Sequence, residues 1–187
     1  MSCAAIRGKL LALQYVISAQ VFDNPTNSTK TVAGVEAPPH SVVAYIYGQG
    51  DDGSLEYDFQ KNEVARLLYN ALTAGVRTAG NDESWVINST DDAQTMVQWS
   101  YAEAIHIDVT VTIEGVTPLS VSEAVNDFVK KYFKSLGVGE TARRLPLIVG
   151  LANLEGVTGV DVLFYGQPHD VEVQPYQIVT FNPPIIN

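Results

Sequence analysis

A histidine and an aspartate two positions apart are the residues of this sequence best spaced for metal chemistry. His106 and Asp108 stand in a stretch where apolar and polar residues alternate. Residues at this spacing share one face of a β-strand, where an imidazole and a carboxylate can hold a metal ion together. No third ligand is evident nearby, so we interpret the pair as polar residues on an exposed strand face, and we expect no metal site.

A glycine pattern at Gly48 to Gly53, which includes Asp51 and Asp52, matches the spacing of a dinucleotide-binding loop. Such a loop needs a helix directly after the glycines, so that backbone amides face the pyrophosphate. Here the apolar helical pattern starts later, and two carboxylates would repel phosphate. We therefore predict an acidic turn and no nucleotide cofactor.

Other catalytic patterns are absent from the sequence. Acidic residues between positions 51 and 92 lack the spacing of a calcium-binding loop. There is no Gly-x-Ser-x-Gly nucleophile motif, and Cys3 is the single cysteine. We therefore expect a protein that is not an enzyme and that needs no cofactor.

The net charge and the lengths of the apolar runs indicate whether nucleic acid or a membrane is an expected partner. Of 187 residues, 11 are basic and 21 are acidic, which gives a formal net charge of −10. An acidic protein repels nucleic-acid backbones, so we expect no nucleic-acid partner. The short basic runs at Lys130-Lys131 with Lys134 and at Arg143-Arg144 read as solvated helix positions. No apolar run reaches the roughly 18 residues of a membrane helix, so we expect no membrane insertion.

Apolar periodicity predicts the elements that position these residues. Helices are expected over residues 4–18, over 60–74 with Gly75 as the stop, from a capping box at Ser120–Glu123 to Leu136, and from Pro146 to about Leu154. Strands are expected over residues 20–23, 41–47, 84–88 and 95–101 (a hairpin around Asp91-Asp92), 105–113, 159–165, 171–174 and 177–181, with order ending at Pro183 and Pro184.

The long strand from Ile105 to Ile113 is the clearest of these. Its odd-numbered apolar residues should face a core. Its even-numbered residues should face water or a partner: His106, Asp108, Thr110 and Thr112.

The two ends of the chain resemble each other in the order helix, strand, loop, proline, strand. Leu13 and Val16 precede Pro39 and a strand, as Leu151 and Leu154 precede Pro175 and a strand. We therefore predict an α+β fold in which two similar helix-strand-strand units flank a central α+β segment that holds the long alternating strand. The expected boundaries are 1–47, 48–118 and 119–187.

A series of short sequence motifs in a fixed order indicates a more specific class of protein. They are Gly34-Val35 with Pro38-Pro39, a valine-rich strand that ends in the acidic turn, Gly75 to Gly80, Leu136 to Glu140, and Gly156 to Val160. In this order and spacing, the sequence resembles the C-terminal half of baseplate J-like proteins of contractile phage tails, the phage Mu type. Typical members carry an additional N-terminal part ahead of this region. We expect a minimal form, or one that a partner completes.

The resemblance implies a structural wedge subunit of a contractile tail baseplate, located in the virion and assembled in the host cytoplasm. Its expected partners are itself, as a homo-dimer within a wedge or ring, and other wedge and hub proteins. The strand residues His106, Asp108, Thr110 and Thr112, and the turn residues Asp51 and Asp52, are then candidate contact residues.

Two other classes of function stay open. One is a small-ligand-binding or regulatory module of two α+β repeats, with a pocket between them. The other is an unrecognised hydrolase, which would need His106 or His169 beside carboxylates in a cleft.

Overall fold

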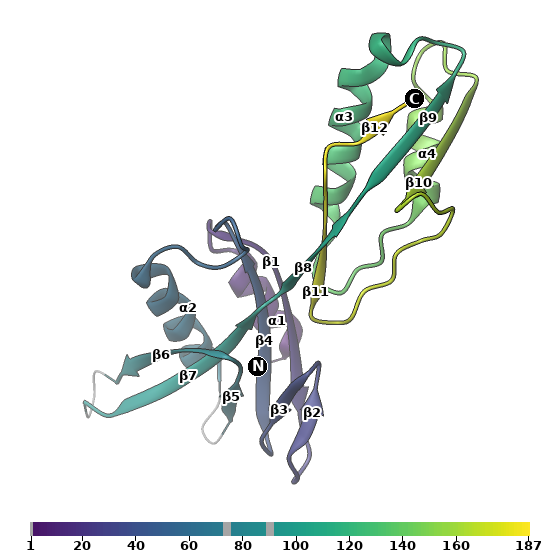
Figure 1. Ribbon diagram of the computed structural model, residues 1–187. Coiled ribbons are helices and arrows are strands. Elements are labelled where there is room, and N and C mark those ends of the chain that lie inside the picture. The colour runs from purple at the N-terminus through teal and green to yellow at the C-terminus, as the bar shows by residue number, and fades with distance from the viewer. Residues whose placement is uncertain (1, 73–75, 89–91) are drawn as a thin grey trace. The chain divides into compact units, whose positions relative to one another are not determined.

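The computed structural model describes residues 2–72, 76–88 and 92–187, and its helices and strands form a mixed α+β structure. Its contacts divide the chain into two compact units, unit 1 (Met1–Glu103) and unit 2 (Ala104–Asn187) (Figure 1). The α+β class expected from the sequence is confirmed. The division differs from the three expected segments, because it falls inside the predicted central segment 48–118. Strands from the first part of that segment pair in unit 1, and its last strand pairs in unit 2.

The sheet of unit 1 is built around β4 (Ser41–Gly48), which is buried along nearly its whole length. β4 pairs antiparallel with β1 (Val16–Asn24) on one edge, and parallel with β5 (Arg77–Ala79) and β7 (Gln94–Tyr101) on the other. β6 (Asp82–Ile87) pairs antiparallel with β7, which confirms the predicted hairpin. β4 reads as a continuous apolar run because both of its faces are covered.

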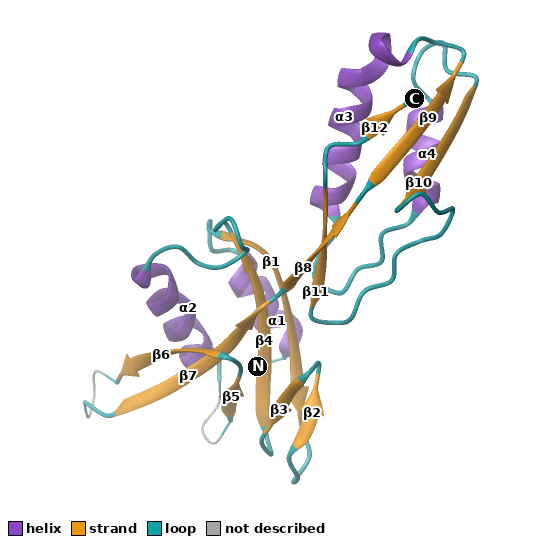
Figure 2. Ribbon diagram, viewed as in Figure 1, coloured by secondary structure: helices purple, strands orange, loops and turns teal. Residues whose placement is uncertain are grey.

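Two helices cover one face of this sheet. α1 (Cys3–Leu11) and α2 (Asp58–Ala71) contact each other, and their apolar residues belong to one core with those of the sheet (Figure 2). Leu10, Leu68 and Trp99 are 0% exposed in this core. The predicted helix stop at Gly75 and the predicted turn residue Asp91 lie outside the described residues.

A small hairpin contacts the other face of β4. Its strands are β2 (Lys30–Val32) and β3 (Val35–Ala37), which pair antiparallel. Successive residues of a strand point to opposite faces, so Tyr45 points away from the helices that cover Ala44. The Tyr45 hydroxyl donates to the Ala33 carbonyl at 2.7 Å in the turn of this hairpin.

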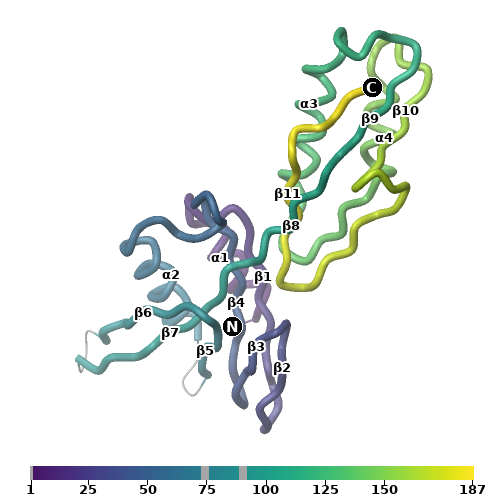
Figure 3. Tube along the Cα trace, viewed as in Figure 1, coloured from purple at the N-terminus to yellow at the C-terminus, as the bar shows by residue number. Residues whose placement is uncertain are grey.

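Unit 2 has β9 (Val109–Glu114) as its central strand. β10 (Gly159–Phe164) pairs with β9 antiparallel, and β12 (Ile185–Ile186) pairs with it in parallel. β8 (Glu103–Ile107), which starts at the unit boundary, pairs with β11 (Gln177–Phe181) in a separate two-stranded sheet. Figure 3 shows how the chain passes from β8 directly into β9 and later returns beside both strands.

Two helices complete unit 2. α3 (Pro118–Ser135) and α4 (Arg144–Ala152) contact each other, and α4 also contacts β10. Their residues Val129 and Leu147 share a core with Val111 of β9, and all three are 0% exposed. No helix among the described residues has the length and apolar character that crossing a membrane requires.

Two predicted boundaries were wrong for identifiable reasons. The first helix ends at Leu11, not residue 18, because Val16 onward pairs with β4, and such pairing outweighs local helical spacing. The third helix starts at Pro118, a residue suited to a first helical turn, and its N-cap is Thr117. The Ser120 hydroxyl donates to the Thr117 carbonyl at 2.7 Å, so it does not cap the helix as predicted.

Two predicted strands and the predicted end of regular structure also differ. The long strand 105–113 is divided at Asp108 into β8 and β9, which pair with different strands. The predicted strand 171–174 forms a single bridge, between Val171 and Ala142. Regular secondary structure does not end at Pro183 and Pro184, because β12 follows them.

The similarity between the two chain ends is one of element order and not of pairing. In unit 1, β1 and β4 are antiparallel neighbours in one sheet. In unit 2, the corresponding strands β10 and β11 pair with β9 and β8, in different sheets. The order of elements along the chain therefore recurs, but the way in which the strands pair does not.

Candidate interaction surfaces

The predicted acidic turn is a closed, hydrogen-bonded structure at the end of β4. The Gly48 amide donates to the Gly53 carbonyl at 2.6 Å, and the Gly53 amide donates to the Gly50 carbonyl at 2.8 Å. These amides are therefore used inside the turn, and the next helix, α2, starts only at Asp58. The geometry accords with the prediction of an acidic turn in place of a phosphate loop.

Both carboxylates of the turn are exposed. The Ser54 amide donates to Asp52 Oδ1 at 3.0 Å. Hydrogen bonds from the Ser54 side chain and then from its amide hold the pKa of Asp52 below its ordinary value, because they stabilise the charged form. Asp52 thus helps to close the turn, while Asp51 stands at its surface.

Gly53 fixes how the turn packs on the strand. Its φ is +79°, and a Cβ there would lie 2.1 Å from Cε2 of Tyr47. The Tyr47 ring therefore occupies the space where any side chain at position 53 would stand. Burial, and then the nearby charge of Asp52, raise the pKa of Tyr47.

An exposed aromatic pair follows the turn and was not among the contact residues predicted from the sequence. The rings of Tyr57 and Phe59 are stacked, with centroids 5.7 Å apart and planes at 14°. They are 55% and 61% exposed. The signal in the sequence was Glu56-Tyr57-Asp58-Phe59, where aromatic residues alternate with acids ahead of a helix.

The polar strand face lies in unit 2, and two of its members are bonded to their own chain. His106 Nδ1 lies 2.6 Å from the Thr180 hydroxyl of β11. The Asn182 side-chain amide donates to Asp108 Oδ1 at 2.8 Å. Both residues are exposed, as predicted, but His106 Nδ1 and Asp108 Oδ1 already have protein partners.

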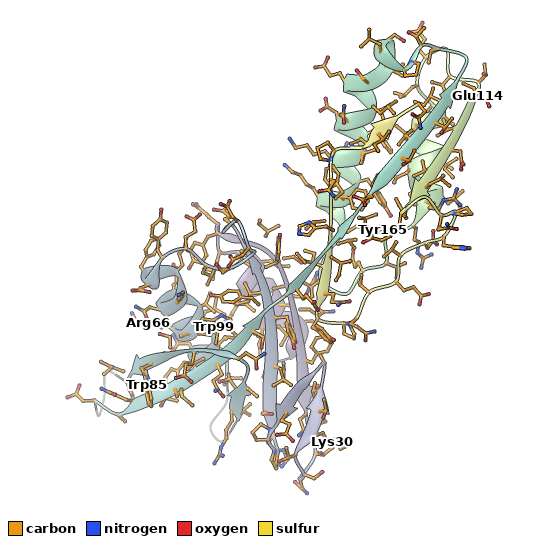
Figure 4. The ribbon with its side chains drawn as sticks, viewed as in Figure 1. Lys30, Arg66, Trp85, Trp99, Glu114 and Tyr165 are labelled. Carbon is orange, nitrogen blue, oxygen red and sulfur yellow. The ribbon has the colours of Figure 1, made fainter. Side chains whose placement is uncertain are left out.

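The backbone around this pair is held by Tyr165, a residue labelled in Figure 4. Its hydroxyl donates to the His106 carbonyl at 2.5 Å, and its amide donates to the Asp108 carbonyl at 2.9 Å. Burial, and then the nearby Asp108, raise the pKa of Tyr165. Tyr165 therefore holds the backbone at His106 and at Asp108, where β8 gives way to β9.

The two threonines of this face sit further along, in β9. Thr110 is half-buried and stands in register with Leu163 of β10 and Ile185 of β12. Thr112 is exposed and stands in register with Asp161. The structure thus keeps these strand residues in unit 2 and places Asp51 and Asp52 in unit 1, and their role in contacts stays a prediction.

Metal binding has no further support in the geometry. Within the described residues, no group of three or more histidine, cysteine, aspartate or glutamate side chains is arranged to hold a metal ion. His106 and Asp108 instead bond to Thr180 and Asn182.

The β6–β7 hairpin presents an exposed apolar surface, which was also not predicted from the sequence. Trp85 and Ile87 of β6 are 56% and 60% exposed, and Met96 of β7 is 41% exposed. Trp85 stands directly opposite Met96 in the strand register. Figure 4 shows the two tryptophans of unit 1, of which Trp99 is 0% exposed in the core.

A groove also opens in unit 1, beside this hairpin. Its volume is about 830 Å³. Its walls come from the end of α2, from β5 and from β7, and include Tyr69, Leu72, Arg77, Met96 and Gln98. The lining combines apolar side chains with one cationic and several neutral polar groups.

Comparison with known proteins gives a likeness of fold. No protein-family model and no curated protein sequence matches the chain. The chain is similar to a chain in the cryo-electron-microscopy structure of the anti-feeding prophage baseplate, 6-fold symmetrised, with a TM-score of 0.52 and 14% sequence identity. The match covers 97% of this chain and 37% of that chain. At this identity, the similarity shows a shared fold.

Proposed function

We propose that the protein is a structural subunit of the baseplate of a contractile tail or a related injection apparatus, of the baseplate J-like wedge type. The observation that carries the proposal is the likeness of fold, over 97% of the chain, to a chain of a prophage baseplate. Fold alone does not assign function. The ordered sequence motifs from Gly34 to Val160 add separate support, because they led to the same class of protein without the structure.

The proposed role requires surfaces for partners and no catalytic residues. The subunit would contact other wedge and hub proteins and further copies of itself, at the end of the tail, after assembly in the host cytoplasm. Interfaces that rearrange on contraction are expected to be modest in area and modular. A chain of two compact units, with the boundary after Glu103 at the start of β8, suits such a part.

Electron microscopy of particles from the source organism tests the proposal directly. The chain, carrying a small internal epitope, is expected to appear in the plate at the end of the tail, in several copies around a hub. Presence of the chain as a free monomer, and its absence from every tailed particle, would refute the proposal. A matched particle without the epitope controls for its effect on assembly.

A second candidate, a small-ligand-binding module, is favoured by the groove of about 830 Å³ in unit 1. Pockets for small molecules typically have volumes in a range of roughly 300–1,000 Å³. A nuclear magnetic resonance screen with a fragment library would support this candidate if Thr78, Met96 and Gln98 shifted together. If no compound shifts these signals at saturating concentration, the groove is not a ligand site.

A further inference from the structure

The positive charge of unit 2 is concentrated in one short stretch. Every lysine and arginine of residues 104–187 lies between Lys130 and Arg144. Arg144 is held within the unit, by Asp161 at 2.7 Å and by the carbonyls of Val162 and Pro168. The remaining cations therefore form the basic surface of this unit.

Lys130, Lys131 and Lys134 make up the exposed face of the last part of α3, called the lysine face here. They border a shallow depression of about 460 Å³ with Asp127 and Ser135. Across the described residues, the single salt bridge is that of Arg144 with Asp161, so these lysines have no such partner.

This arrangement has a cost in the isolated chain. Lys130 and Lys134 stand four residues apart on one helix, where like charges repel, and Asp127 is the single acid among the residues that border the depression. Lys134 lies in the last turn, where the helix dipole favours a cation, but Lys130 and Lys131 precede that turn. A partner that is acidic would relieve the repulsion.

The chain itself offers a surface of that chemistry. Residues 51–59 contain Asp51, Asp52, Glu56 and Asp58 and no basic residue. Beside these acids lies the exposed, stacked pair of Tyr57 and Phe59. Aromatic residues are enriched at interfaces, and an ammonium group over an aromatic ring is attracted to it.

Apolar side chains can complete the contact on the side of unit 2. α4 contacts α3, and its residues Leu145 and Val149 are 68% and 54% exposed. These two stand four residues apart, on one face of the helix. They are exposed apolar side chains on the helix that packs against α3, and aromatic side chains of a partner can bury such groups.

We propose that the lysine face of α3 binds the acidic turn and the aromatic pair of a second copy of this chain. The contact joins two different surfaces, so each copy can bind one neighbour through unit 1 and another through unit 2. Contacts of this kind generate closed rings or open filaments. This proposal rests on the proposed function, because it supplies a contact between neighbouring copies in a baseplate. The contact itself can be measured with the purified protein, without any tailed particle.

Sedimentation velocity of the full chain over a range of concentrations tests the proposal. The mass is expected to rise with concentration and to fall as salt is added, because salt screens exposed charges. The charge reversal K130E/K131E, and separately D51K/D52K, should each lower the association constant at least about tenfold, since like charges across an interface oppose binding.

A mixture of the two variants provides the decisive measurement. The D51K/D52K chain keeps its lysine face, and the K130E/K131E chain keeps its acidic turn. Equal amounts of the two should therefore associate where each variant alone does not. The variant K9E/K30E, which changes exposed lysines of unit 1 by the same charge, should associate like the unaltered chain.

The outcomes separate this inference from the proposed function. A chain that stays monomeric at all concentrations, or an association that both reversals leave unchanged, overturns the inference. Circular dichroism of each variant checks that the fold is kept. If K130E/K131E still enters tail-end plates normally, the contact is wrong and the baseplate function stands.

Discussion

The acidic turn and the polar strand face are both exposed and polar, but they differ in what their side chains already bind. In the turn, Asp52 bonds to Ser54 two residues away, and Asp51 lies at the surface. On the strand face, His106 and Asp108 bond to residues 74 positions along the chain. Exposure alone therefore does not distinguish a contact surface from polar groups that stabilise their own unit.

A substitution at Gly53, which packs the turn against Tyr47, has the largest expected effect on stability. Gly53→Ala should lower the free energy of unfolding of unit 1 by about 3 kcal/mol, because a Cβ would meet the Tyr47 ring and the positive φ disfavours alanine. Chemical denaturation measures the change. Gly8→Ala, where nothing lies within 4 Å, is the matched control and should not destabilise the protein.

The strand face gives an intermediate effect. Asp108→Ala should lower the stability of unit 2 by about 1 kcal/mol, the typical worth of one hydrogen bond, because the Asn182 amide loses its acceptor. In a double-mutant cycle with Asn182→Ala, the two losses should overlap. Fully additive losses would show that the bond between these side chains contributes nothing.

Lowering the pH should reduce stability by a smaller amount, through protonation of Asp52 in the turn. The pKa of Asp52 lies below its ordinary value of 3.8, so its contribution is fully present above that value and is lost as pH falls through the folded pKa. Ser54→Ala should raise the pKa of Asp52 in a carboxyl-carbon magnetic resonance titration. An unchanged titration would show that Ser54 does not stabilise this charge; Ser122→Ala in unit 2 is the control.

The outermost carboxylate should matter least for stability. Asp51→Lys is expected to change the free energy of unfolding by less than about 0.5 kcal/mol, as is usual for surface substitutions. Its measured melting temperature should match that of the unaltered chain. A large loss of stability would mean that Asp51 supports the turn, and it would remove this residue as a specific probe of contacts.

Local patterns predicted much of the fold correctly. The alternation predicted from Ile105 to Ile113 does bury Ile107, Val109 and Val111, at 0%, 2% and 0% exposure, while Ile105 is half-buried. The hairpin of β6 and β7 and the helix α2 were also expected. These features depend on backbone periodicity within a few residues, which the sequence displays directly.

The prediction of interaction sites was less complete. Trp85, Ile87 and the stacked pair of Tyr57 and Phe59 went unnoticed, because an apolar residue in a strand or helix pattern reads as core unless its neighbours are known. The lysines of α3 were interpreted as an ordinary solvated face. Their lack of salt bridges within the described residues appears only once the surrounding elements are in place.

Local patterns along the chain were enough to predict the α+β class, the acidic turn, and which side of the strand around Val109 faces a core. Contacts between distant segments set three further features: this strand divides at Asp108, β12 joins β9, and His106 and Asp108 bond to Thr180 and Asn182. The reason is physical. Side-chain periodicity follows from the geometry of each strand, whereas pairing between distant strands depends on which surfaces the whole chain can bury together.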